Sequence, residues 1–198
     1  MTKIITISRE FGSGGREIGH RLSERLGIPF YDKQLIKIAA EDIELEEHIF
    51  ELYDDAFMEK EEMKYTPFST IYEVPMSDQI FIAQSRVIHR LAEHGPCVIV
   101  GRCADMVLKD EQCLNLFFYA NFKKRVQRLM EKERMPESEL KAMEKKVREI
   151  DRKRKDYYQY YTGNEWGKPQ NYHLCLDSQK AGMEACIDAA IAYMNHLE

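Results

Sequence analysis

Residues 4–26, IITISREFGSGGREIGHRLSERL, decide the fold of this chain. The stretch opens on residues 4–7, which are isoleucine-rich and predict a strand. Three glycines then fall within four positions, at Gly12, Gly14 and Gly15. Apolar residues at helical spacing follow: Ile18, Leu22 and Leu26. A strand, a glycine-rich loop and a helix in this order are the plan of a phosphate-binding loop.

The residue types in this loop suit a bound anion. Glycines let the backbone curl so that several amide N–H groups point inward. The N-terminus of the following helix adds roughly half a positive charge. Arg16, at the start of that helix, adds a full charge and a fork of donors. We therefore predict a phosphate site here; the alternative is a plain glycine-rich turn that binds nothing.

The loop departs from the standard pattern G-x-x-x-x-G-K-[ST] at three positions. With Gly14 as the second glycine, Arg9 stands where the first glycine belongs. Gly15 replaces the lysine, and Arg16 replaces the hydroxyl residue that binds magnesium. The prediction therefore depends on the position of the loop, between an N-terminal strand and an amphipathic helix.

Composition limits the class of protein. The chain has 198 residues, 44% of them hydrophobic, which suits one domain with a sizeable core. The net charge of −5 argues against a general nucleic-acid binder. No run of eighteen apolar residues exists, so we expect no membrane span. Met1 leads straight into a strand without a signal segment, which predicts a cytoplasmic protein.

Cysteine and histidine spacing predicts neither disulfides nor a metal centre. The five cysteines include no C-x-x-C pair, and the six histidines are scattered. We assign none of them to catalysis or to metal binding.

Strands and helices alternate along the rest of the chain. Further strands are predicted at 28–31, 97–100, 114–119 and 172–177. Helices are predicted from residue 33 and at 76–94, 121–134, 137–160 and 180–197. This alternation implies a doubly wound parallel sheet, whose ligand site lies at the carboxyl ends of the strands.

A second group of candidate residues follows the strand at 97–100 directly. Arg102 and Asp105 come after Gly101 and face the same crevice as the glycine loop. Arg102 could hold a second phosphate or a base, with Asp105 orienting it or accepting a hydrogen bond from the substrate. The alternative is an ion pair between the two side chains at the start of a helix.

A third group lies on the polar helix at 137–160. Arg148 and Arg152 share a stripe with Lys155, and Asp151 can pair with Arg154 one turn later. Arginines around one aspartate suit a mobile cover that neutralises charge during phosphoryl transfer. A solvated helix laced with ion pairs is the alternative.

These three groups occur in an order that resembles the cytidylate kinase-like family, a branch of the P-loop nucleoside monophosphate kinases. The Asp151–Arg154 helix segment contributes to this resemblance, which covers nearly the whole chain. The other segments that carry it are SREFGSGGREIG (8–19), FYDKQLI (30–36), VIVGRCAD (98–105) and YYTGNEWGKPQNYHLCLDS (160–178).

The resemblance implies a three-layer α/β fold of the P-loop nucleoside triphosphate hydrolase type, with a doubly wound sheet of five parallel strands. It makes residues 1–198 a single domain. The core would comprise 1–40 and 77–198, with a helical insertion that binds the nucleoside monophosphate at about 41–76. A lid would lie at about 135–165.

The resemblance also assigns residues to roles. Apart from the resemblance, our own hypothesis makes Arg16, Arg148 and Arg152 catalytic, with Arg16 on the β- and γ-phosphates and the other two stabilising the transferring group. Acceptor binding falls to Arg102, Asp105, Asp151 and Arg154. ATP phosphates would rest on Gly12, Ser13, Gly14, Gly15, Arg16 and Glu17. Magnesium is expected with ATP, but its protein ligands stay open because the loop hydroxyl is missing; Ser13 and Glu17 are candidates.

The leading hypothesis is therefore phosphoryl transfer from ATP to CMP, dCMP or a similar small acceptor, with small-molecule nucleotides as partners. One alternative is a nucleotide-binding regulatory protein without kinase activity, since the loop lysine is absent. Another is a kinase for a non-nucleotide acceptor. The sequence leaves the oligomeric state open.

Overall fold

A computed structural model describes residues 4–32 and 75–196. Within these residues, five parallel strands form one sheet in the order β2-β3-β1-β4-β5. They are β1 (Ile4–Arg9), β2 (Phe30–Tyr31), β3 (Cys97–Val100), β4 (Cys113–Tyr119) and β5 (Leu174–Asp177). The predicted doubly wound parallel sheet is confirmed.

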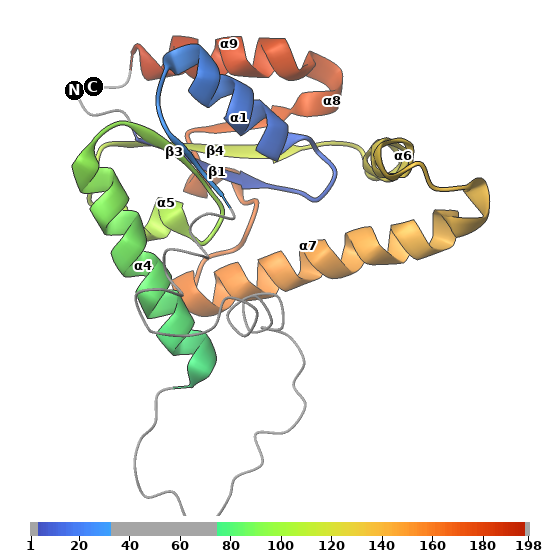
Figure 1. The fold of residues 1–198 in the computed structure, drawn as a ribbon, viewed down its shortest axis with the longest axis horizontal. Coiled ribbons are helices and arrows are strands. Elements are labelled where there is room, and N and C mark those ends of the chain that lie inside the picture. Colours follow the sequence, from blue (N-terminus) through green and yellow to red (C-terminus); the bar gives the residue numbers. More distant parts are fainter. Residues whose placement is uncertain (1–3, 33–74, 197–198) are drawn as a thin grey trace, which may run out of the picture.

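Helices cover both faces of this sheet. The described helices are α1 (Gly15–Leu26), α4 (Met76–His94), α5 (Ala104–Val107), α6 (Phe122–Glu133), α7 (Leu140–Thr162), α8 (Ser178–Ala181) and α9 (Met183–Met194). Figure 1 shows α1 and α9 on one face, α4 and α5 on the other, and α7 running as a long rod beyond α5. No described helix is long and apolar enough to cross a membrane.

The central strand β1 is buried on both faces, as a parallel strand between helices requires. Ile5 and Ile7 pack into the core beneath α1 and α9, whereas Ile4 packs into the core beneath α4. Thr6 is buried too, and its hydroxyl donates to Asn115 Oδ1 on β4 at 2.7 Å. The apolar run therefore places β1 at the centre of the sheet, where its carboxyl end meets the glycine loop.

The helical hairpin of α6 and α7 has a small core of its own, made by Val126, Leu129, Met143 and Val147. Farther along α7, Tyr161 stacks on Phe81 of α4 with ring centroids 3.9 Å apart. Because α7 is anchored at both α6 and α4, it has to pass the carboxyl end of β1 between them.

Two predicted helices differ in detail. The segment at 180–197 is broken by Gly182, whose positive φ of 81° separates α8 from α9. The segment at 137–160 begins with a 3-10 turn at 137–139 and extends to Thr162. The helix from residue 33 and the insertion at about 41–76 lie outside the described residues, apart from Pro75 and Met76.

The buried sheet predicts a clear contrast between two leucines. Leu116, in the middle of β4, is fully buried, so Leu116→Ala should lower the free energy of unfolding by about 2–5 kcal/mol. Leu140 lies at the exposed start of α7, so Leu140→Ala should lower the free energy of unfolding by only about 0.5 kcal/mol. Urea denaturation of both variants measures the difference, and equal losses would contradict the assignment of the core.

Candidate functional site

The glycine loop joins the end of β1 to the start of α1. Its backbone curls because Gly12 and Gly14 adopt positive φ angles of 82° and 87°, and Gly14 is the N-cap of α1. Ser13 fixes the curl, since both its amide (3.3 Å) and its hydroxyl (2.9 Å) donate to the carbonyl of Glu10. The predicted strand, loop and helix are thus all present.

The loop glycines also permit close contact with α6. A Cβ on Gly12 would lie 2.9 Å from the carbonyl oxygen of Arg125, and one on Gly14 would lie 2.6 Å from Arg128 Nη1. A side chain at position 12 would push the backbone of α6 away from the loop, whereas one at position 14 would displace the guanidinium of Arg128. Packing against α6 therefore requires glycine at position 12, and backbone conformation favours it at both positions.

Several amides of the loop have no protein acceptor. Within residues 4–32 and 75–196, this holds for the N–H groups of Gly12, Gly14, Arg16 and Glu17. The first amides of a helix have no partner inside the helix, and they carry the positive end of its dipole. Such a concentration of N–H groups is what an anion-binding loop requires.

A buried guanidinium, that of Arg125 on α6, holds the loop in place. Its side chain is only 7% exposed. It contacts Asp151 Oδ2 on α7 at 2.5 Å, the Phe11 carbonyl at 3.0 Å and Glu10 Oε2 at 3.3 Å. Its Nε also donates to the carbonyl of Ala120 at 3.1 Å. One side chain therefore joins the loop, the end of β4 and α7.

Asp151 completes this network from the other side. Its Oδ1 accepts a hydrogen bond from the amide of Phe11 at 2.7 Å, so Phe11 is bound through both its N–H and its C=O. Burial raises the pKa of Glu10 above 4.5, although the Ala120 amide and Arg125 both favour its charged form. Asp151 thus contacts the glycine loop through the Phe11 amide and Arg125, whereas the sequence analysis placed it with the acceptor.

A cluster of arginines lies beside the loop, at the carboxyl ends of β1, β2 and β3. Arg154 on α7 donates to the Arg9 carbonyl at 2.9 Å. Asp32, just after β2, accepts from Arg16 Nε and lies 3.8 Å from Arg9 Nη2. Burial lowers the pKa of Arg154, and Arg102 acts in the same direction. The structure therefore brings Arg16, Arg102 and Arg154 together.

The turn after β3 is strained. Gly101, Arg102 and Cys103 all have positive φ angles, of 82°, 59° and 54°. Left-handed conformations at two non-glycine residues cost of order 1 kcal/mol or more each. Strain of this kind is concentrated at functional sites, because the surrounding structure has to impose it. It places Arg102 near Arg9 and Arg154, whose pKa values it helps to lower.

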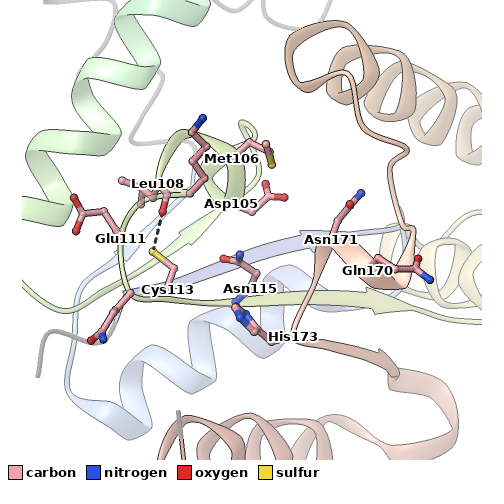
Figure 2. A pocket seen from close by; sticks show the side chains of 11 residues that line it. Asp105, Met106, Leu108, Glu111, Cys113, Asn115, Gln170, Asn171 and His173 are labelled. Atoms are coloured by element: carbon pink, nitrogen blue, oxygen red, sulfur yellow. Dashed lines mark hydrogen bonds between the residues drawn. The ribbon is translucent and has the colours of Figure 1, made fainter. Parts of the chain in front are cut away.

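Asp105 takes a different direction from Arg102. It is buried and accepts a hydrogen bond from the hydroxyl of Tyr158 on α7 at 2.6 Å. It also lines a cavity of about 430 Å³ together with Asn115, Asn171 and His173 (Figure 2). No residue of the glycine loop lines this cavity. The two predicted acceptor residues at 102 and 105 thus lie in different surroundings.

The predicted site residues on α7 also lie in two different surroundings. Arg148 and Arg152 are more than half exposed and pair with Glu144 and Asp156 on their own helix. Arg148 also lies over the ring of Phe122, 4.4 Å from its centroid. Of the predicted α7 residues, Asp151 and Arg154 contact the loop and the end of β1. Arg148 and Arg152 lie on the solvent-exposed face of α7.

Sequence analysis missed four residues that shape the site, namely Arg9, Glu10, Arg125 and Arg128. Arg9 is the last residue of the buried strand β1 and Glu10 follows it, a position that usually places a side chain at the ligand edge. Arg125 precedes the inward-facing Val126 on α6, and this position is the one sequence feature that could have indicated its burial. Its burial depends on Glu10 and Asp151, which are distant in the sequence.

The two candidate magnesium ligands of the loop, Ser13 and Glu17, both have protein partners among the described residues. Both candidate ligands are engaged: Ser13 donates to the Glu10 carbonyl, and Glu17 pairs with Arg21 and Arg128. The described residues include no cluster of three or more metal-binding side chains. Magnesium is usually held by one or two carboxylates together with phosphate oxygens and water.

Comparison with known proteins supplies the family. The model of the cytidylate kinase-like family matches residues 4–180. The chain therefore belongs to the cytidylate kinase-like family. No curated protein sequence matches it significantly.

Solved structures agree on the fold. An uncharacterized protein from Eubacterium ventriosum is 27% identical, with a TM-score of 0.73 over 97% of this chain and 98% of that chain. Shikimate kinase from Bacteroides thetaiotaomicron has a TM-score of 0.56 at 14% identity, over 99% and 97% of the two chains. A gluconokinase from Sinorhizobium meliloti gives 0.56 at 12% identity, over 99% and 93%. The fold is that of the P-loop kinases.

The Arg125 network predicts a large loss of stability in Asp151→Ala. The variant leaves the Phe11 amide without its acceptor and the buried guanidinium with Glu10 as its remaining carboxylate partner. We expect a loss of about 2–4 kcal/mol in the free energy of unfolding. Asp156→Ala, which breaks an exposed pair on the same helix, should lose less than about 0.5 kcal/mol. Similar losses in the two variants would contradict this role of Asp151.

The burial of Asp105 predicts a dependence of stability on pH. Burial raises its pKa above 3.8, although the Tyr158 hydroxyl favours the charged form. Because the folded state holds the proton more tightly than the unfolded chain, stability from this group is full below pH 3.8 and falls as the pH rises through the folded pKa. Asp105→Asn should therefore raise Tm relative to the wild type more at pH 7 than at pH 4. Equal differences at the two pH values would contradict this.

Proposed function

We propose that this protein transfers a phosphoryl group from ATP to CMP, dCMP or a similar small acceptor. One observation carries the proposal: loop amides without protein acceptors lie beside a cluster of arginines at the carboxyl ends of β1, β2 and β3. Transfer of this kind needs positioning and charge neutralisation more than it needs a covalent side chain.

ATP would bind with its phosphates on the loop. The amides from Gly12 to Glu17 would cradle the β- and γ-phosphates, and the dipole of α1 would favour their charge. Arg16, at the first turn of α1, would add a guanidinium from the exposed side of the loop. The bonds from Ser13 to the Glu10 carbonyl hold the loop backbone before substrate binds, which would lower the reorganisation needed during transfer.

The acceptor would bind on the other side of the arginine cluster. Arg102 and Arg154 would hold its anionic group, and both lie close enough to Arg9 to lower its pKa. Both carboxylate oxygens of Asp151 are already bound, so it would act by holding α7 against the loop. Asp105 would contribute from the neighbouring cavity, where Tyr158 fixes its orientation.

Arg148 and Arg152 would take part as residues of a lid at about 135–165. Both side chains are exposed and pair with Glu144 and Asp156 on α7 itself, so they would reach the transferring group by leaving these partners. Magnesium would enter as the counter-ion of the ATP phosphates, held by phosphate oxygens and water.

A kinase for a non-nucleotide acceptor is the second candidate. Shikimate kinase and gluconokinase, by their names kinases of non-nucleotide acceptors, share this fold. A coupled assay of ADP release with CMP, dCMP, other nucleoside monophosphates, shikimate and gluconate distinguishes the two. ATP binding without turnover for any acceptor would instead support a regulatory nucleotide-binding protein.

The proposal predicts that Arg16→Ala lowers turnover at least tenfold, which corresponds to roughly 1.4 kcal/mol of transition-state stabilisation. Arg25→Ala is the matched control, because Arg25 lies in the last turn of the same helix and pairs with Asp188 at the surface. The control should retain its rate. ADP release at saturating substrate measures both variants, and an unchanged rate in Arg16→Ala would remove Arg16 from the mechanism.

A further inference from the structure

Two departures of the loop from the standard pattern are related in space. Position 9 carries an arginine where the pattern has glycine, and position 15 carries a glycine where the pattern has lysine. In the sequence these are separate changes, six residues apart. In the structure they are neighbours, because a Cβ on Gly15 would lie 2.7 Å from Arg9 Cβ and 3.2 Å from its Cγ.

The side chain of Arg9 passes between two glycines. After Gly15 it extends to Gly101, at the end of β3, where an added Cβ would collide with Arg9 Nη1. The guanidinium therefore lies across the carboxyl ends of β1 and β3, next to the glycine loop. Any side chain at either glycine would displace it.

The charge around Arg9 favours an anion. Its side chain is 19% exposed, and Asp32, at 3.8 Å, is the carboxylate that faces it among the described residues. The other charged neighbours are Arg16 on α1, Arg102 after β3 and Arg154 on α7. Burial, followed by Arg154, lowers the pKa of Arg9 from 12.5 to about 9, so it is still a cation at pH 7. A phosphate at this point would relieve the repulsion among these guanidinium groups.

We propose that Arg9 supplies, from the end of β1, the phosphate-binding cation that the standard loop carries as a lysine at the start of α1. Its ligand is the β- and γ-phosphate portion of a nucleoside triphosphate. The inference rests on the proposed function only in requiring that phosphates bind in this loop. It does not depend on transfer or on the identity of the acceptor.

Two other arginines near the loop fit this role less well. Arg16 is 61% exposed and its Nε is bound to Asp32. Arg128 is held by Glu17 at 2.8 Å and lies on the α6 side, against Gly14. Arg9 alone among these three passes over position 15, where the standard pattern has its lysine.

Binding of inorganic tripolyphosphate, measured by isothermal titration calorimetry on the full chain, tests the proposal without ATP turnover. Arg9→Gln should weaken binding at least tenfold, and so should Arg9→Gly. The exchange variant Arg9→Gly/Gly15→Lys, which restores the standard pattern at both positions, should regain at least tenfold over Arg9→Gly. Arg25→Gln, a surface arginine at the end of α1, should bind as the wild type does.

Gly15→Ala provides a test that does not remove the charge. Alanine suits the first turn of a helix, but its Cβ would lie 2.7 Å from Arg9 Cβ and 3.1 Å from Phe118 Cβ, so Arg9 has to shift relative to the loop. We expect binding at least fivefold weaker than that of the wild type. Circular dichroism and the Tm without ligand establish that each variant is folded.

Three results would overturn the inference: wild-type affinity in Arg9→Gln, wild-type affinity in Gly15→Ala, or a folded exchange variant that binds no better than Arg9→Gly. Absence of binding by the wild-type chain would overturn the inference and the proposed function together. Binding that depends on Arg9, with no ADP release for any acceptor, would uphold the inference and reject phosphoryl transfer.

Discussion

The buried guanidinium of Arg125 is the contact on which the candidate site depends. A charge removed from water has to be compensated by partners, because its desolvation costs several kcal/mol. Here the partners are two carboxylates, Glu10 and Asp151, and the carbonyl groups of Phe11 and Ala120. They come from the loop, from the residue that follows β4 and from α7. Satisfying one arginine therefore aligns the segments that surround the proposed phosphate site.

Positive charge is concentrated at the candidate site although the chain as a whole is acidic. The net charge is −5, yet Arg9, Arg16, Arg102 and Arg154 gather at one edge of the sheet. Asp32 offsets part of this charge. The turn at 101–103 costs backbone energy, and the lowered pKa values of Arg9 and Arg154 show that burial and mutual repulsion disfavour their charged forms. An arrangement that is costly without a ligand and favourable with an anion is typical of a binding site.

The sequence predicted most of the architecture because that part depends on local patterns. Strand 97–100 matched β3 residue for residue because it is a continuous apolar run that ends at Gly101. The segment at 76–94 matched α4 because its apolar residues recur at helical spacing and Gly95 follows it. The site was predicted less evenly. The polar helix α7 offers several arginines at helical spacing, and nothing local distinguishes Arg154, which faces the loop, from Arg152, which faces solvent. The face that turns inward is chosen by Phe11, Arg125 and β1, which lie far away in the chain.

The sequence by itself therefore determined the parallel sheet, the glycine loop at the end of its first strand and membership of a family with a recognisable motif order. These follow from hydrophobic period, glycine placement and spacing, which are properties of short segments. The tertiary structure alone decided that Arg125 is buried, that Asp151 accepts a hydrogen bond from the Phe11 amide and that Arg9 lies in the space beside Gly15. The physical reason is that charged side chains are positioned by the partners that compensate their desolvation, and folding brings those partners together from distant parts of the chain.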